Sequence, residues 1–406
     1  MTDEEQRGWP VVFAYAAVCA GTQLLWLTYA PIDTGSAHYY GVSPAAIGWL
    51  ANVFPLLYVV LAIPAGRLLD SRFRPTLAAS GLLMAAGGLI RLGGPAFAWA
   101  MAGQLMIAVA QPVVLSAMGK VAGEYLPVGR RAGGIAFASA ASFAGMLFAL
   151  VLGPAIGGHG HVGRLLAVEA ALGIPAAFAL AVTLRRPGLA GDDVEHAAVE
   201  SSTARVLWAL PEMRTMCVLV FVGFGVFVGL TTWLQTLLHP SGVSEQAAGA
   251  LLVGMLVTGM VGTAVLPPWL ARRGAEPAYM RVAIFVSAAG CVALAAFTPL
   301  GVRAVVLAAM GFALLPALPV IIALAERLAG PAAGTAGAIV WLAGNLGGLV
   351  VALIVQVLVH DPVAAFLVMA AVTLAGLPFA ARFPATTTIA PRLPEGSADT
   401  MGLEAR

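Results

Sequence analysis

Long apolar runs constrain this 406-residue chain more than any other feature. About twelve runs of roughly 20 apolar residues, the length that crosses a bilayer, follow one another between short Pro- and Gly-containing stretches. Only 10% of the residues are charged, whereas a soluble domain carries about 25%. Such a chain cannot cover a water-facing surface, so its main solvent must be lipid. Because hydrocarbon offers no hydrogen bonds to the backbone, each run must form a helix.

The runs predict an all-α membrane protein with twelve transmembrane helices arranged as two six-helix pseudo-repeats. We expect an N-terminal half at 1–184, a cytoplasmic linker at 185–213, a C-terminal half at 214–384 and a disordered cytoplasmic tail at 385–406. The first nine residues lack the basic region of a signal peptide, so the first run is expected to be retained. The predicted spans are 10–31, 44–65, 75–93, 98–120, 132–154, 163–184, 214–238, 245–268, 279–298, 302–325, 334–358 and 362–381.

Basic residues predict the orientation of these spans. With the N-terminus inside, only Arg91, Arg164 and Arg303 of the 21 lysines and arginines fall outside. Cytoplasmic loops are enriched in Lys and Arg, so both termini are expected in the cytoplasm. Arginine far outnumbers lysine, and Ala and Gly are abundant, which is typical of a GC-rich bacterial genome. We therefore expect a multi-pass protein of the bacterial inner membrane.

Several classes of function find no support in the sequence. The basic residues are scattered over short loops, which argues against nucleic acid as a partner. Cys19, Cys217 and Cys291 each stand alone in an apolar run, so neither a disulfide nor a zinc site is expected. We also find no nucleophile–base pair, metal cluster or phosphate-binding motif. The sequence thus predicts no enzyme, no catalytic residue and no cofactor.

A charged segment, Gly66 to Arg74, separates the second and third runs and reads as a cytoplasmic loop. It resembles the loop 2–3 signature of the major facilitator superfamily, G-x-L-x-D-R-x-G-R. Gly66, Leu68, Asp70 and Arg74 match the signature and Arg72 matches one position late, whereas Ser71 and Phe73 depart from it. The resemblance implies the major facilitator fold, in which two six-helix halves rock about a midplane substrate site, and implies a monomer.

The two halves echo each other in sequence. The segment from Glu124 to Gly145 aligns with that from Glu326 to Gly348, whereas the second-half counterpart of 66–74, at 267–274, lacks the aspartate. We expect an ion-pair cluster that holds the halves together on the inside, with Glu326 and Arg327 as its second-half equivalent. Solvated charges that only set topology are the alternative. The expected gating residues are Arg67, Asp70, Arg72, Arg74, Lys120, Glu124, Arg130, Arg131 and Glu326.

Polar and aromatic residues within the spans are the candidate substrate ligands, because such groups usually face the bundle interior. Gln104 and Gln111 are seven residues apart and share a helix face. A tryptophan face attracts cations, and an amide can orient hydroxyl or ammonium groups. Hydrogen bonding between helices and interfacial anchoring are the alternatives. The candidates are Gln23, Trp26, Tyr29, Gln104, Gln111, Thr231, Thr232, Gln235, Trp341 and Asn345.

Glu169 is the carboxylate that we place within a span, in the outer third of the sixth. It is a candidate proton carrier. A glutamate that snorkels to the interface or pairs with Arg164 is the alternative.

A closer resemblance begins in the first two spans. The segments 26–32, 38–43 and 47–50 are similar to the start of the feline-leukaemia-virus-receptor-related transporters, and 63–70, 87–91, 103–112 and 119–127 continue the likeness. That family moves choline and related amines and has been linked to haem. The resemblance implies a ligand held between Trp26 and Gln111. The family's seventh-span tyrosine falls at about Val228 and its eleventh-span glutamine at about Gly344. Trp233, Trp341 and Asn345 would therefore have to replace these ligand contacts of the second half.

Together these observations predict a secondary active or facilitative transporter that works by alternating access. The substrate would be a small neutral or cationic organic molecule, with choline as one candidate, because no buried midplane charge suits an anion. Two alternatives remain open. One is a proton-coupled exporter of a drug, metallophore or other secondary metabolite, and the other is a transport-dead membrane sensor or partner-binding protein.

Overall fold

The computed structural model describes residues 8–157, 161–188, 203–358 and 360–385. These residues contain twelve helical segments that are long and apolar enough to cross a membrane, and they contain no β-strand. The predicted all-α fold with twelve spans is therefore confirmed. Residues 386–406 of the predicted tail and residues 189–202 of the predicted linker lie outside the described residues.

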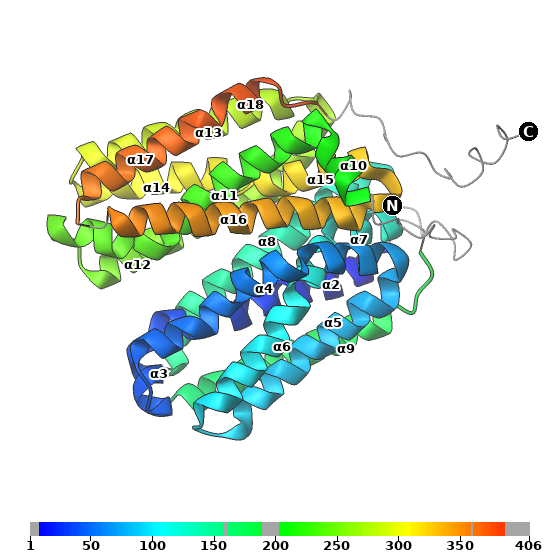
Figure 1. Ribbon diagram of the computed structural model, residues 1–406, viewed down its shortest axis with the longest axis horizontal. Helices are drawn as coiled ribbons and strands as arrows, with labels where there is room; N and C mark the ends of the chain where they lie inside the picture. Colours follow the sequence, from blue (N-terminus) through cyan, green and yellow to red (C-terminus); the bar gives the residue numbers. More distant parts are fainter. Residues whose placement is uncertain (1–7, 158–160, 189–202, 359, 386–406) are drawn as a thin grey trace, which may run out of the picture.

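Six long helices form the N-terminal half, drawn in blue to green at the bottom of Figure 1. The short helices α3 and α7 follow the first and fourth spans. The bounds are α2 (Trp9–Leu27), α3 (Asp33–Tyr40), α4 (Pro44–Ser71), α5 (Phe73–Ile90), α6 (Phe97–Ser116), α7 (Met118–Tyr125), α8 (Val128–Leu152) and α9 (Val162–Thr183). Irregular turns follow at η1 (Ala30–Ile32), η2 (Arg91–Gly93) and η3 (Gly153–Gly157).

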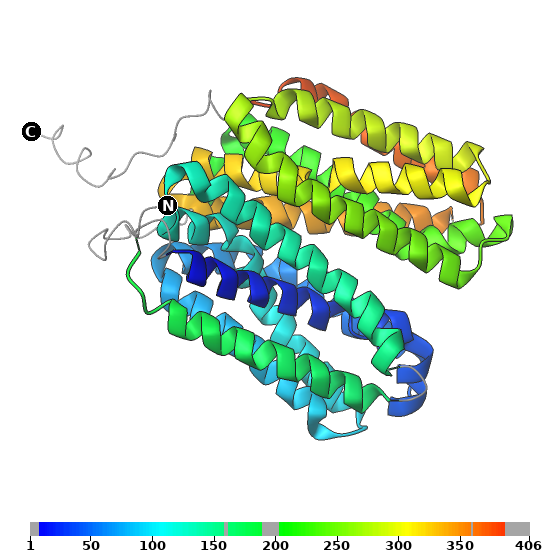
Figure 2. The ribbon, with the colours of Figure 1, turned by 180° about the vertical axis from the view of Figure 1, so that it is seen from behind.

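The C-terminal half repeats this plan and lies beside the first half in both views (Figures 1 and 2). Its tenth span is divided into α14 and α15 at Leu315–Pro316. The bounds are α10 (Thr203–Ala209), α11 (Pro211–Leu238), α12 (Glu245–Arg273), α13 (Glu276–Ala296), α14 (Leu300–Leu314), α15 (Ala317–Ala329), α16 (Ala333–Val357), α17 (Pro362–Ala375) and α18 (Leu377–Ala381), with short turns η5 (His239–Ser241) and η6 (Gly330–Ala332).

Several boundaries differ from the predicted ones. The seventh span begins at Pro211 rather than at 214, and the predicted linker contains the short helix α10. The fourth span ends at Ser116, because the helix is interrupted at Ala117 before α7 begins. Proline is well suited to the first turn of a helix, where its missing N–H is not needed, which explains the start of α11.

The segment 66–74 is not the loop that the sequence predicts. Helix α4 continues through Gly66 and Asp70 to Ser71, and α5 begins at Phe73. Arg72 alone leaves the helical conformation, with φ −143° and ψ 58°. Asp70 therefore lies on the last turn of a helix, where its direction is fixed.

Close packing of α4 against α16 joins the two halves at the predicted cytoplasmic end. A Cβ atom on Gly66 would lie 2.9 Å from Thr335 Cα and 3.0 Å from the Ala338 side chain. Glycine is thus required at this position for the helices to approach. The same contact brings Asp70, one turn further on, to the start of α16.

Candidate functional site

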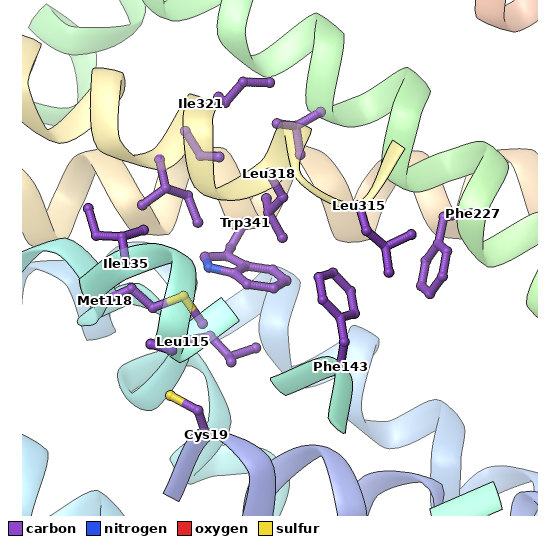
Figure 3. Packing of buried hydrophobic residues seen from close by; sticks show 14 of the residues in the cluster. Cys19, Leu115, Met118, Ile135, Phe143, Phe227, Leu315, Leu318, Ile321 and Trp341 are labelled. Atoms are coloured by element: carbon purple, nitrogen blue, oxygen red, sulfur yellow. The ribbon is translucent and has the colours of Figure 1, made fainter. Parts of the chain in front are cut away.

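Trp341, from α16, lies at the centre of the molecule between the two halves. Figure 3 shows its indole between Cys19, Leu115 and Met118 of the N-terminal half and Leu315 and Leu318 of the C-terminal half. The side chain is 4% exposed. Despite this burial, its Nε1 atom has no hydrogen-bond partner among the described residues.

Two glutamines approach the same region from the N-terminal half. Gln23 lies one helical turn beyond Cys19 on α2, and Gln111 lies one turn before Leu115 on α6. Residues four apart share a helix face, so each glutamine lies on the helix face that carries one of these neighbours of Trp341. Gln23 is 1% and Gln111 3% exposed, yet Gln23 Oε1 and Gln111 Nε2 also lack partners in the described part of the chain.

We call Gln23, Gln111 and Trp341 the central polar cluster. Buried polar groups are nearly always hydrogen-bonded, and leaving one unsatisfied costs about 1–3 kcal/mol. These three groups, from α2, α6 and α16, are therefore candidate contacts for a ligand with hydrogen-bonding groups.

Trp26 lies three residues beyond Gln23 on α2 and is half-buried. Its Nε1 donates to the carbonyl oxygen of Ala51 on α4 at 3.0 Å. Its ring lies 6.1 Å from that of Phe54, at 35°. Because the N–H is already bonded to protein, Trp26 can offer a ligand its aromatic face but no donor.

A small apolar recess, with a cavity volume of about 30 Å³, lies next to Trp341. The connection is direct, because the Phe224 ring that lines the recess lies 5.8 Å from the Trp341 ring. Phe143 contributes from the N-terminal half, and α11, α14 and α15 provide the remaining walls. Its lining residues are all apolar, which suits a small apolar group of a ligand: Phe143, Leu219, Val220, Gly223, Phe224, Phe227, Leu314, Leu315, Ala317, Leu318 and Ile321.

The remaining candidate ligands are dispersed. Thr231 donates to carbonyls of its own helix, and Thr232 and Gln235 are exposed. Asn345 donates to the Trp341 carbonyl at 2.9 Å. In the second half Trp233 donates to the Ala352 carbonyl at 3.0 Å.

Gln104 and Tyr29 lie nearer the predicted outer end of the N-terminal half, in a hydrogen-bonded network. Gln104 Nε2 donates to the carbonyls of Leu25 and Leu50 at 3.2 and 3.1 Å. The Tyr29 hydroxyl lies 3.2 Å from that of Tyr40. The shared face of Gln104 and Gln111 therefore spans two different environments.

Glu169 belongs to that network. Its carboxylate forms an ion pair with Arg91 at 3.0 Å and accepts from Thr28 at 2.7 Å, and both charged side chains are 0% exposed. Its partner is thus Arg91, from the turn after α5, and not the Arg164 that the sequence suggested.

Asp70 joins the halves by binding the first turn of α16. Its carboxylate accepts from the backbone N–H groups of Gly334 and Thr335, each at 2.9 Å, and from the Thr335 hydroxyl at 2.6 Å. The unpaired N–H groups and the dipole of a helix N-terminus favour an anion there. Lys120 contacts the same carboxylate at 3.2 Å. Burial lowers the pKa of the Lys120 ammonium below its usual value, and the Asp70 carboxylate opposes that shift.

Glu326 makes a second link in the opposite direction. From the end of α15 in the C-terminal half it accepts from the backbone N–H of Gly119 in the N-terminal half at 2.9 Å. A Cβ atom on Gly119 would overlap the Glu326 carboxylate. We call the Asp70–α16 and Glu326–Gly119 contacts the two carboxylate latches.

The expected cytoplasmic ion-pair cluster is present only in part. Arg74 pairs with Glu124 at 3.4 Å within the N-terminal half. Arg131 donates to the Leu126 carbonyl at 3.2 Å, Arg72 and Arg130 are exposed, and Arg67 is half-buried. Glu326 binds a backbone N–H rather than Arg327, which is exposed. The sequence does not predict these contacts, because no side-chain pattern encodes pairing to backbone amides.

Comparisons with known proteins agree with this geometry. A family model described as the Major Facilitator Superfamily matches residues 11–352. Human MFSD10, an organic anion transporter, superposes with a TM-score of 0.72 at 16% identity, covering 94% of this chain and 100% of that one. The fucose:proton symporter FucP of Escherichia coli gives 0.70 at 16% identity, covering 91% and 98%. At these identities the structural likeness shows the fold alone.

Several sequence relatives are solute carriers or choline/ethanolamine transporters. Solute carrier family 49 member A3 of Danio rerio is 28% identical over 74% of this chain and 67% of its own length. The choline/ethanolamine transporter FLVCR1 of Mus musculus is 26% identical over 60% and 50%. The human choline/ethanolamine transporter FLVCR2 is 31% identical over 29% of this chain and 23% of its own length. The matches thus span half or less of these two choline/ethanolamine transporters.

Proposed function

Because the chain belongs to the major facilitator superfamily, we propose that it is a secondary active or facilitative transporter of a small neutral or cationic organic molecule. It works as a monomer by alternating access in the bacterial inner membrane, with both termini in the cytoplasm. Its partners are the substrate and the lipid bilayer, and it has no enzymatic activity.

The central polar cluster is the observation that carries this proposal. Its three unpartnered groups would be satisfied by a ligand with hydrogen-bonding atoms. The adjoining apolar recess would take a small apolar group of the same molecule. The aromatic face of Trp26, whose N–H is already occupied, suits an alkylammonium group. The substrate is therefore a compact amphiphile with a neutral or cationic polar end.

Choline and ethanolamine are the first molecules to test, because the curated relatives FLVCR1 and FLVCR2 are choline/ethanolamine transporters. Trp26 and Gln111 support that choice. The apolar lining of the recess makes a small amine with an additional apolar group a second candidate.

The two carboxylate latches support a gating role at the predicted cytoplasmic end. Each latch joins one half to the other through buried charge-assisted hydrogen bonds. We assign the structure to a state with the inside closed. Release of both latches would open the site to the cytoplasm.

Proton-coupled export has less support. Glu169 is fully buried and paired with Arg91, so protonating it in this state would leave a buried arginine without its counter-ion. A sensor without transport activity is the outcome that the experiment below distinguishes.

A thermal-shift screen followed by uptake into liposomes tests the proposal. Purified protein would be screened against choline, ethanolamine, longer alkylamines, amino acids, metallophores and haem. We expect an amine to raise the melting temperature and to be transported, with both effects lost in Gln111→Ala and Trp26→Ala. Gln235→Ala, at an exposed position, is the matched control and should behave as wild type. Binding without transport by the wild-type protein would favour a sensor.

A further inference from the structure

The indole N–H of Trp26 is held by a carbonyl that an ordinary helix would not offer. Helical hydrogen bonds run from the N–H of one residue to the carbonyl four residues earlier. Pro55 lies inside α4 and has no N–H, so the carbonyl of Ala51 loses its helical donor. Trp26 Nε1 occupies that carbonyl at 3.0 Å.

Gln104 binds both helices that the Trp26–Ala51 hydrogen bond links, α2 and α4. Its amide donates to the carbonyl of Leu25, the residue before Trp26 on α2. It also donates to the carbonyl of Leu50, the residue before Ala51 on α4. A single side chain from α6 therefore clamps both partners of the Trp26–Ala51 bond, where α2, α4 and α6 pack together (Figure 1).

The Arg91–Glu169 pair contacts the oxygen of the Gln104 amide, opposite its NH₂ group. Arg91 Nη1 lies 3.5 Å from Gln104 Oε1, which orients the amide so that its NH₂ group faces the two carbonyls. Glu169 and Thr28 fix the guanidinium in turn, at 3.0 Å each. The Arg91–Glu169 pair thus fixes the orientation of the Gln104 amide.

We propose that Pro55 and Gln104 are positioning residues for Trp26, and that the Arg91–Glu169 pair is the static anchor of this arrangement. They fix the plane of the indole, so that the aromatic face is presented to the substrate site in one orientation. This inference rests on the proposed function in one respect, because it takes Trp26 as a wall of the substrate site.

The first test needs no substrate. Protein with ¹⁵N-labelled tryptophan in nanodiscs gives one indole N–H signal per tryptophan, and Trp26→Phe identifies the Trp26 signal. In Pro55→Ala the new N–H of residue 55 bonds the Ala51 carbonyl along the helix and draws it from Trp26. We expect the Trp26 signal to move upfield and its hydrogen exchange to accelerate at least about fivefold, the equivalent of one net hydrogen bond.

Helix α4 supplies a matched control. Pro64 lies in the same helix, and the carbonyl that it frees belongs to Val60, which is 65% exposed. Pro64→Ala should leave the Trp26 signal unchanged. Gln104→Leu should shift it, whereas Gln111→Leu should not. An unchanged Trp26 signal in Pro55→Ala, or equal shifts in both proline variants, overturns the proposal.

The second test measures the consequence for binding, with choline as the probe. We expect Pro55→Ala and Trp26→Phe each to weaken choline binding about five- to tenfold, while Pro55→Ala leaves the melting temperature of the free protein equal or higher. The double variant should bind as the single variants do, because both remove the same bond. Additive losses contradict the inference. If wild-type protein fails to bind choline, the substrate assignment fails, and the spectra still decide the positioning role.

Discussion

At the scale of single residues, two glutamines on one helix have opposite surroundings. Gln104 donates to two backbone carbonyls and is held by Arg91, whereas the Gln111 amide nitrogen has no partner in the described residues. Both are buried. A hydrogen-bonded buried amide stabilises the protein that contains it, and an unsatisfied one destabilises it.

We therefore expect Gln111→Leu to stabilise the ligand-free protein by about 1 kcal/mol while abolishing substrate binding, because it removes an unsatisfied polar group. Gln104→Leu should instead destabilise it by about 1–3 kcal/mol, because two buried carbonyls each lose a hydrogen bond from the amide and Arg91 loses an acceptor. Thermal unfolding in detergent without substrate measures both effects. Lower melting temperatures in both variants would show that Gln111 is satisfied by protein or water.

The sequence predicted Gln23, Trp26, Gln111 and Trp341 as interior ligand candidates, with the last three near mid-span, and in the structure Gln23, Gln111 and Trp341 are buried. It could not separate Gln104 from Gln111, because periodicity specifies a helix face and not the depth at which another helix approaches. It also could not reveal that Pro55 frees the carbonyl for Trp26, since that pairing joins residues of two helices.

At the scale of helices, the latches use the ends of α16 and α7 rather than side-chain ion pairs. Asp70 meets the first turn of α16, and Glu326 meets the second residue of α7. Each carboxylate comes from the opposite half of the molecule. Such contacts form only when the two halves are close on this side, which makes them sensitive to conformation.

We expect Gly119→Ala to release the second latch, because the added methyl group overlaps the Glu326 carboxylate. Asp70→Asn should weaken the Asp70–α16 latch by removing the charge at the α16 N-terminus, an effect of about 0.3–2 kcal/mol. Spin labels at Val128→Cys and Arg327→Cys, on opposite halves, would report longer distances in both variants.

Gly123→Ala is the control for the first of these variants. It changes the same helix, but its new Cβ would meet nothing within 4 Å. A distance distribution in Gly119→Ala that matches those of Gly123→Ala and of the wild type would exclude a gating role for Glu326.

At the scale of the whole molecule, the distribution of basic residues predicts the orientation in the membrane. The latches lie at the end where the sequence places most basic residues, including Arg67, Arg72, Arg74 and Lys120. Cytoplasmic loops retain Lys and Arg because translocating them is unfavourable. That end is therefore expected to face the cytoplasm.

Reporter fusions measure this orientation. Green fluorescent protein fused after residue 385 should fluoresce, since it folds in the cytoplasm, whereas alkaline phosphatase inserted near Pro299, between the ninth and tenth spans, should be active. The reverse pattern would invert the proposed topology and place the latches on the outer side.

The sequence by itself determined the solvent, the number of spans and the fold, because apolar length and charge distribution are local properties that no tertiary contact can reverse. Only the tertiary structure decided how the polar residues are paired. Glu169 with Arg91, Glu326 with Gly119 and Trp26 with Ala51 each join segments distant in the chain. Their pairing depends on where two helices cross, and that crossing is set by close packing at positions such as Gly66, where α4 meets α16.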